Sequence, residues 1–303
     1  MAQPRNIMKS LRVKNFLQVD GTLVGSGPSN TPGDVYYVDG NKSASGDGKT
    51  WGGAFATITE GITALNSSSN KNSILYIGEG YYIEAAGVTL SANDCTIVGL
   101  GNGADAVVWF GTGTTGTVDA ATDDLLTITG NNNKFVNMGF YVHKDTKCAI
   151  VLDDTGGAST ASFNEFIDCN FTREAANGQS AGIKFLGGNY NRIEGCVFTA
   201  SSKDAGIIIN SQTGNPSQNV IRGCEFTGIA YAIDFGAVGH NTLIDRNFFM
   251  TGSLSGDAMT AAIETTGAGA AYILVTDNYT DLSAADLVVG TGSAVSEISN
   301  HTS

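Results

Sequence analysis

Paired acidic residues are the first groups in this 303-residue chain whose types and spacing could do chemistry. Asp123–Asp124 and Asp153–Asp154 are each adjacent in sequence. Two carboxyl groups in one cleft, one of them with a raised pKa, can deliver and remove protons. Neighbouring residues of a strand point to opposite faces, so an adjacent pair on a strand cannot share a cleft. We therefore expect both pairs at turns and identify no catalytic residues.

Cysteine thiols are the second candidates. The five cysteines are widely spaced and form no CxxC pair, which disfavours zinc and thioredoxin-type sites: Cys95, Cys148, Cys169, Cys196 and Cys224. A nucleophilic thiol needs a base or a positive group beside it, and no histidine accompanies the last three. A structural role for them, as small buried side chains, is favoured over a redox or catalytic role.

Oxygen-bearing side chains alternate through one loop and superficially match a calcium-binding series: Asp39, Asn41, Ser43, Ser45 and Asp47. The glutamate that such a loop carries at its twelfth position is absent. A solvated turn is therefore favoured, and we expect no metal and no cofactor.

Composition excludes several classes of partner. The net charge is −13, with 40 glycines, 4 prolines and 15% charged residues. Such a polyanion lacks the clustered basic residues that phosphate binding requires, so we expect no nucleic-acid and no membrane partner. The first residues show no signal-peptide pattern and no stretch reaches membrane-spanning length, which predicts a chain made in a cytoplasm with reduced thiols.

An eight-residue frame recurs along the chain. NRIEGCVF, from Asn191, returns as NVIRGCEF, from Asn219. Six further copies, three clear and three degenerate, begin at Asn133, Asn164, Asn241, Asn93, Tyr272 and Ser293. The frame is constant, whereas the distance between copies varies from 21 to 40 residues. This pattern is typical of stacked coils that share walls and differ in their loops.

Stacking predicts columns of like residues. Position eight should form an inward aromatic column, with Phe171, Phe198 and Phe226 and, beyond them, Phe140 and Phe248. Position six should form a small-residue column of Cys169, Cys196 and Cys224, continued by Met138. Position one should form an amide ladder, with Asn164, Asn191 and Asn219 between Asn133 and Asn241. Position five, a sharp bend, is Asn137, Asp168, Gly195, Gly223 and Asp245.

Further columns follow from the segments between the frames. An inward isoleucine column is predicted at Ile150, Ile183, Ile207, Ile233 and Ile263. Outward charges of alternating sign should neutralise one another on adjacent coils: Lys134, Glu165 and Arg192 at position two, Glu194 and Arg222 at position four. Arg246 and Asp277 interrupt the small-residue column, and a salt bridge between them is favoured over a site.

The N-x-I-x-x-C-x-F frame resembles the right-handed parallel β-helix of the pectin-lyase-like superfamily, over about Val35 to Ser303. The opening VYYVDG…GDG…W is also similar to that superfamily, in which a helix covers the first coil. Apolar residues at helical spacing predict that helix within Trp51–Leu65. We therefore predict an all-β solenoid with an N-terminal arm and linker at 1–33, a cap of strand, helix and first coil strand at 34–90, and about eight coils at 91–303.

The resemblance implies where an active site would lie. Lyases of this fold carry a calcium-binding carboxylate cluster and an arginine, and hydrolases carry paired aspartates on adjacent coils. Gly239–His240–Asn241 is similar to the Gly-His-Gly of polygalacturonases but lacks its last glycine and the Arg-Ile-Lys that follows. Candidate carbohydrate-contacting aromatics show no clustering: Trp109, Tyr141, Tyr190 and Tyr231. The sequence thus favours a non-enzymatic protein.

A basic arm precedes the acidic coils. Arg5, Lys9, Arg12 and Lys14 are four of the 16 basic residues, and Ser26–Asp34 is a linker. An anchor to a partner is favoured over a frayed terminus. FLQVDGTLVGSG, from Phe16, resembles the head segments of phage fibres and spikes.

These features together favour a virion structural protein: a β-helical decoration, cement or spike docked through the arm on a phage capsid or tail. It would be assembled in the host cytoplasm. The resemblance to such spikes implies a homo-oligomer, for which a trimer is the common form, with outward Val151 and Ile208 at its interface. The alternative is a polysaccharide lyase or glycosidase of the tailspike type.

Overall fold

The computed structural model describes residues 33–68, 71–112, 123–142, 147–154, 160–172, 181–209, 216–236, 241–251, 259–265, 272–282, 287–289, 295–298 and 300–302. The four basic arm residues Arg5, Lys9, Arg12 and Lys14 and the phage-like segment after Phe16 lie outside the described residues. His143, His240 and most of the Ser26–Asp34 linker also lie outside them.

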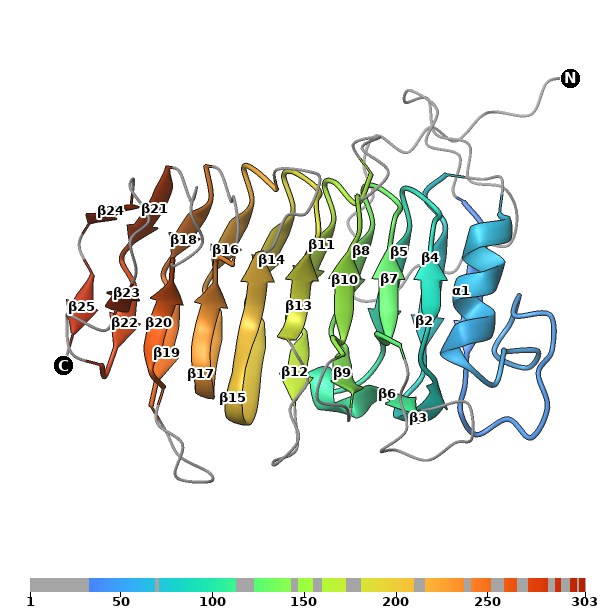
Figure 1. The fold of residues 1–303 in the computed structure, drawn as a ribbon. Helices are drawn as coiled ribbons and strands as arrows, with labels where there is room; N and C mark the ends of the chain where they lie inside the picture. The colour runs from blue at the N-terminus through green and yellow to red at the C-terminus, as the bar shows by residue number, and fades with distance from the viewer. Residues whose placement is uncertain are drawn as a thin grey trace, which may run out of the picture. The chain divides into compact units, whose positions relative to one another are not determined.

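The described chain is a right-handed parallel β-helix, which confirms the predicted fold class (Figure 1). Three walls of parallel strands run along the stack. Wall A contains, in order, β1 (Val35–Val38), β2 (Ile74–Ile77), β5 (Thr96–Gly99), β8 (Lys134–Val136), β11 (Glu165–Ile167), β14 (Arg192–Glu194), β16 (Val220–Arg222), β18 (Leu243–Asp245), β21 (Ile273–Thr276) and β24 (Val295–Ile298).

Walls B and C are joined where long strands bend from one into the other. Wall B contains β3 (Gly80–Ala85), β6 (Val107–Thr112), β9 (Gly139–Val142), β12 (Asn170–Thr172), the first parts of β15 (Val197–Ile209) and β17 (Glu225–Asp234), β19 (Phe248–Met250), β22 (Tyr279–Thr280) and β25 (His301–Thr302). Wall C contains β4 (Val88–Leu90), β7 (Leu126–Ile128), β10 (Ile150–Leu152), β13 (Ala181–Phe185), the second parts of β15 and β17, β20 (Ala261–Glu264) and β23 (Val288–Val289). A short 3-10 helix, η1 (Ala104–Ala106), precedes β6.

Aromatic side chains stack along the interior of wall B. Phe171 pairs in register with Phe198, and Phe198 with Phe226. Their ring centroids are 4.7 and 4.8 Å apart, with 7° between the planes of each pair. All three are buried. The spacing of the rings equals the spacing of parallel strands, so identical side chains recur because successive coils lie directly on one another.

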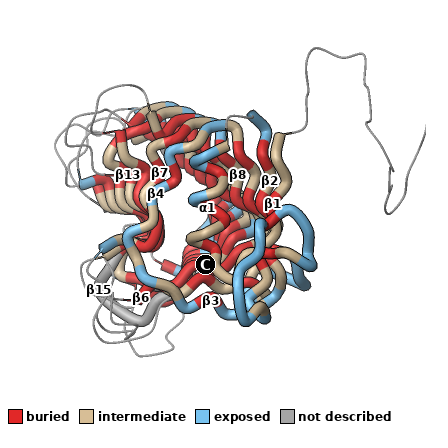
Figure 2. Tube along the Cα trace, turned by 90° about the vertical axis from the view of Figure 1, so that its right-hand side faces the viewer, coloured by how far each residue is buried: buried red, intermediate tan, exposed pale blue. Residues whose placement is uncertain are grey.

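Small residues of wall C make room for these rings. A Cβ added to Gly182 would lie 3.0 Å from the ring of Phe198, and one added to Gly206 would lie 2.8 Å from the ring of Phe226. Ile183, Ile207 and Ile233 follow as register partners and are buried. The isoleucine column of wall C and the phenylalanine column of wall B therefore fill the interior of the β-helix together. The buried parts of the chain face this interior (Figure 2).

Two asparagine ladders hold the corners of the coils. At the corner before wall A, the Oδ1 atoms of Asn133, Asn164, Asn191 and Asn219 each accept the backbone N–H of the preceding coil, at 2.8–3.0 Å. At the corner after wall A, Asn247 and Asn278 take the same role, with Asn278 Oδ1 accepting from Asn247 N at 2.9 Å. Each buried amide thus satisfies a backbone donor that no strand could reach.

The register of the copy from Asn241 differs from the predicted one by one residue. Val220 pairs with Leu243, so Thr242 takes position one and Asn241 is exposed. Phe249 is therefore the core ring, whereas Phe248 is 51% exposed. The bend falls at Arg246, with φ 54°, and not at Asp245. Asn247 then replaces cysteine in the small-residue column, where its amide makes ladder hydrogen bonds.

The α-helix α1 (Ile58–Ser67) contacts β1, β2, β3 and β4 and lies over the first coil (Figure 2). It begins at Ile58 because Thr57 and Glu60 form a capping box. Residues before Thr57 are not helical, since Phe55 bridges Val38 of β1. The helix is thus shorter than the predicted Trp51–Leu65, although its buried face is the predicted one.

Candidate functional site

The cysteine column contains no activated thiol. Cys169, Cys196 and Cys224 are buried, and Cys196 Sγ donates to the Phe166 carbonyl oxygen at 3.5 Å. Burial raises the pKa of Cys196 well above its ordinary value, and the two neighbouring thiols add to the rise. Burial also raises the pKa of Cys95 to about 12. All three thiols of the column are buried and donate to backbone carbonyl oxygens of the preceding coil, so the column has a packing role.

The adjacent acidic pairs brace loops. Asp124 Oδ1 accepts from the Cys148 backbone N–H at 2.6 Å. Asp154 is buried, and its Oδ1 accepts from both the N–H and the hydroxyl of Thr160, at 3.0 and 2.9 Å. These bonds give both carboxyl groups structural roles, as expected for residues at turns.

Charges on the outside of wall A are paired. Lys134 lies 3.3 Å from Glu165, and Arg192 contacts Glu194. Arg222 and Arg246 both contact Asp245, at 2.7 and 3.1 Å. The predicted Arg246–Asp277 bridge is therefore replaced by Arg246–Asp245, because the shifted register puts Arg246 at the bend and Asp245 in the last strand position before it.

A carboxylate pair that the sequence prediction missed lies on the outside of wall C. Asp234 of β17 pairs in register with Glu264 of β20. Ile233 and Ile263, the preceding residues, are buried in the core, so both acidic side chains point outward. Their Cα atoms are ~4.8 Å apart, as in any parallel pair. Burial raises the pKa of Asp234, and the negative charge of Glu264 raises it further.

The surroundings of this pair are those of a shallow outer face. Ile208 is the register partner of Asp234 on the other side, and Lys184 comes next, ~10 Å from Asp234. Tyr231 lies between Ala205 and Ala261 in the neighbouring outward column, so small residues flank its ring. A raised-pKa acid beside a second carboxyl, with an aromatic ring on the same strand, is an arrangement suited to proton transfer on a bound polymer.

The sequence contained a signal for this pair. YAIDF and AAIET were both aligned on the isoleucine column, and each has an acidic residue directly after its isoleucine. The sequence analysis considered only acidic residues that are adjacent in the chain. Carboxyl groups come together on one face when they occupy equivalent positions of neighbouring coils.

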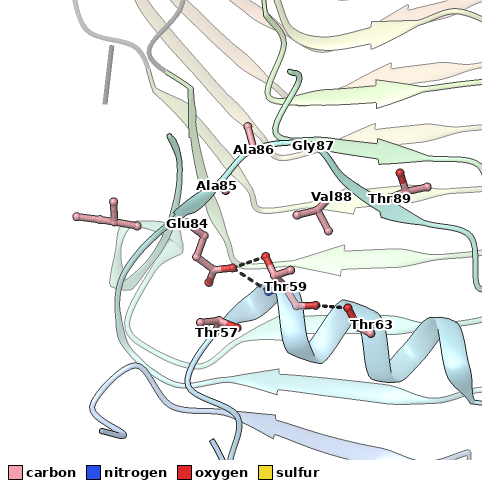
Figure 3. A pocket seen from close by; sticks show the side chains of 10 residues that line it. Thr57, Thr59, Thr63, Glu84, Ala85, Ala86, Gly87, Val88 and Thr89 are labelled. Carbon is pink, nitrogen blue, oxygen red and sulfur yellow. Dashed lines mark hydrogen bonds between the residues drawn. The ribbon is translucent and has the colours of Figure 1, made fainter. Parts of the chain in front are cut away.

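A hollow lies beside α1, and the carboxylate that lines it caps the helix. It has a volume of about 690 Å³ and is lined by Glu84 and several threonines (Figure 3). Glu84 accepts hydrogen bonds from Ile58 N and Thr59 N at 2.6 and 2.8 Å and from the Thr59 hydroxyl at 2.5 Å. Burial raises its pKa despite these bonds. A carboxylate bonded to helix N–H groups is a structural cap.

The predicted aromatic contacts separate into buried and exposed groups. Trp109 is fully buried and Tyr141 is 8% exposed, which excludes Trp109 from the surface. Tyr141 stacks on Phe110, with centroids 3.9 Å apart, beside a hollow of about 350 Å³. Tyr190 is 47% exposed and stacks on Phe163. Tyr141 and Tyr190 each belong to an aromatic pair, with Phe110 and Phe163, two residues that were not among the predicted carbohydrate-contacting aromatics.

Within the described residues, no group of three or more histidine, cysteine, aspartate or glutamate side chains is arranged to hold a metal ion. The helix found there does not have the length and apolar character needed to cross a membrane.

Solved structures share the fold. Pectin methylesterase from Aspergillus niger in its deglycosylated form is 14% identical with a TM-score of 0.58, over 92% of this chain and 87% of that one. The same enzyme in penultimately deglycosylated form gives 14% and 0.58, over 91% and 87%. A rhamnogalacturonan lyase is 14% identical with a TM-score of 0.48, over 89% and 87%. No protein-family model and no curated protein matches the sequence. At this identity the likeness shows the parallel β-helix fold.

Proposed function

We propose that the chain acts on a polysaccharide at the outer face of wall C, with Asp234 and Glu264 as the reacting groups. The observation that carries the proposal is their register pairing on adjacent coils, together with the raised pKa of Asp234. Retaining glycoside hydrolysis uses carboxyl groups about 5–5.5 Å apart, and two acidic side chains on one face of adjacent parallel strands, with Cα atoms ~4.8 Å apart, are close enough to adopt that separation. The shared fold with pectin methylesterase supports the choice of substrate class.

The two carboxyls would divide the chemistry by their surroundings. Asp234 is the better proton donor of the two because its pKa is raised, and in its acid form it gives its proton to the glycosidic oxygen as that oxygen leaves the anomeric carbon. Glu264, as carboxylate, forms an ester bond to the same carbon. A water molecule then gives its proton to Asp234 and its hydroxide to the anomeric carbon, which releases Glu264 and restores both groups.

Incubation with a panel of neutral and acidic polysaccharides tests the proposal by the appearance of new reducing ends. Asp234→Asn and Glu264→Gln should each lower the rate by about 100- to 10,000-fold. Glu225→Gln is the matched control, because Glu225 is an exposed carboxylate of the same strand β17. The proposal fails if the native chain releases no ends from any polymer, or if the control loses as much activity.

A structural role in a virion is the second candidate, and the basic arm favours it. Arg5, Lys9, Arg12 and Lys14 lie within the first 14 residues of a chain whose net charge is −13. In this proposal the arm docks on a phage capsid or tail, and the chain forms a homo-oligomer such as a trimer. Val151 is a poor interface residue, because contacts within the chain leave it 3% exposed. Co-purification with capsids, lost when residues 1–33 are deleted, is the expected result.

A further inference from the structure

In eight successive coils, from that of β2 to that of β21, the corner directly before wall A adopts the left-handed backbone conformation. The residues concerned, here called the corner column, have φ between 52° and 62°: Asn72, Asp94, Asn132, Phe163, Tyr190, Gln218, Asn241 and Tyr272. Backbone hydrogen bonds link successive members to the next coil, for example Phe163 N to Asn189 O at 2.9 Å and Tyr190 N to Ser217 O at 3.0 Å. The column is thus a regular feature of the stack.

Three members of the corner column are aromatic, which the backbone does not favour. Asparagine and aspartate enter the left-handed region at least cost, whereas bulky side chains are strained there. Burial does not offset this strain, because Phe163 is 50%, Tyr190 47% and Tyr272 71% exposed. Exposed bulky residues in a strained conformation are retained where the conformation serves a function.

The aromatic stack ends in a hollow. The rings of Phe163 and Tyr190 are parallel within 5°, with centroids 4.8 Å apart. On the other side of Phe163 the next members of the column, Asn132, Asp94 and Asn72, have short side chains. A hollow of about 420 Å³ occupies the space that further rings would fill, and Phe163 and Glu165 line one end of it.

We propose that this hollow binds a neutral glycan, with one sugar ring stacked on the free face of Phe163. The apolar C–H face of a sugar ring packs on an aromatic ring as another aromatic would. Asn72 and Asn132 present amide groups that both donate and accept, which suits hydroxyl groups. Asp94 and Glu165 add acceptors and Lys134 adds donors to the same hollow.

Charge selects a neutral glycan over an acidic one. Lys134 lies 3.3 Å from Glu165, and Lys71 lies 3.6 Å from Asp94, so both cations near the hollow are already paired. The chain as a whole carries −13, which repels a polyanion. The hollow extends over four coils, about 14 Å at the strand spacing, and therefore accommodates several sugar rings along the stack. This inference concerns a different wall from Asp234 and Glu264 and stands independently of cleavage there.

Affinity electrophoresis against dextran, mannan, xylan and polygalacturonate tests the site. The Asp234→Asn, Glu264→Gln double variant is the protein used, so that cleavage cannot change the result. Phe163→Asn inserts the residue type that the column uses elsewhere and should fold normally. It should weaken binding to a neutral polymer about tenfold, by loss of the ring contact, with an unchanged or higher thermal midpoint.

Tyr272→Asn is the matched control, since it makes the same kind of change in the same column away from the hollow. It should leave affinity unchanged. The inference is overturned if none of the neutral polymers is retained, if Tyr272→Asn weakens binding as much as Phe163→Asn, or if polygalacturonate is the polymer whose binding depends on Phe163. Loss of neutral-polymer binding in Phe163→Asn with normal cleavage by the otherwise native chain would separate the two proposals.

Discussion

The electrostatic environment of an acidic residue in this fold depends on which side chain the neighbouring coil places beside it. Asp245 is 7% exposed in its side chain and contacts two arginines, so its charge is compensated. Asp234 lies one coil earlier on another wall, beside Glu264, and its pKa is raised. Both residues follow a buried isoleucine, so local sequence alone does not separate them. The residue on the neighbouring coil decides the difference.

Asp234→Asn should stabilise the protein at neutral pH. A carboxyl whose pKa is raised on folding contributes stability below its unfolded pKa, and loses that contribution as pH rises through the folded value. The native protein should therefore have a lower free energy of unfolding than the variant from about pH 4 upward. The gap at pH 7 should be roughly 0.2–1 kcal/mol, because solvent screens a partly exposed pair.

Urea unfolding of both proteins at pH 3 and pH 7 measures this gap. Glu225→Gln, on an exposed site of the same strand, should show no comparable change between the two pH values. Equal stability of native protein and Asp234→Asn at pH 7 would mean that Glu264 does not act on Asp234 as described.

Elements in this fold are positioned by their caps and registers. α1 begins where Thr57, Glu60 and the more distant Glu84 satisfy its first N–H groups. The predicted helix face was correct because the apolar spacing is local. The first turn was not predictable, since Glu84 belongs to β3 and meets the helix only when the first coil has closed.

Glu84→Ala should destabilise the protein by about 1–2 kcal/mol, the cost of losing a helix N-cap. The freed N–H groups of Ile58 and Thr59 face a hollow, where water partly replaces the carboxylate. Chemical unfolding followed by circular dichroism measures the loss. Glu79→Ala is the control, because Glu79 is an exposed glutamate directly before β3. A loss no larger than that of the control would contradict the capping role.

The register of β18 shows that a repeated sequence frame can predict the fold without predicting the register of every strand. NTLIDRNFF fits the frame with either of its two phenylalanines at position eight. The choice depends on which phenylalanine is buried and on the side-chain amide of Asn247, which donates to Asn278 Oδ1 of the next coil. Contacts between coils settle that choice, whereas the clear copies from Asn164, Asn191 and Asn219 already agree in every column.

Across the whole stack, burial of the thiols reports the integrity of the coils. All five cysteines are buried and form no disulfide, from Cys95 near the first coils to Cys224. Each lies under neighbouring coils, so a reagent gains access only when coils separate. The repeated frame made the stack predictable, while Trp109 was misplaced on the surface because its strand precedes the first clear copy.

A thiol reagent at pH 8 should therefore label none of the five cysteines in native protein and all five in denaturant. The labelling rate in intermediate urea should follow the fraction unfolded. Rapid labelling of Cys169, Cys196 or Cys224 in native protein, read by mass spectrometry, would contradict the packing role. A chain with these cysteines replaced by alanine serves to identify non-cysteine labelling.

The asparagine ladders have a consequence for how such a chain can change its length. Asn164 Oδ1 accepts the backbone N–H of Asn133 in the coil before it, and the backbone N–H of Asn164 donates to Asn191 Oδ1 in the coil after it. Each coil of the ladder therefore offers the same hydrogen-bonding groups to the coil before it and to the coil after it. A tandem duplication of residues 164–190 would insert one more coil and lengthen the β-helix by ~4.8 Å. The first coil under α1 and the loops of the other coils would stay unchanged.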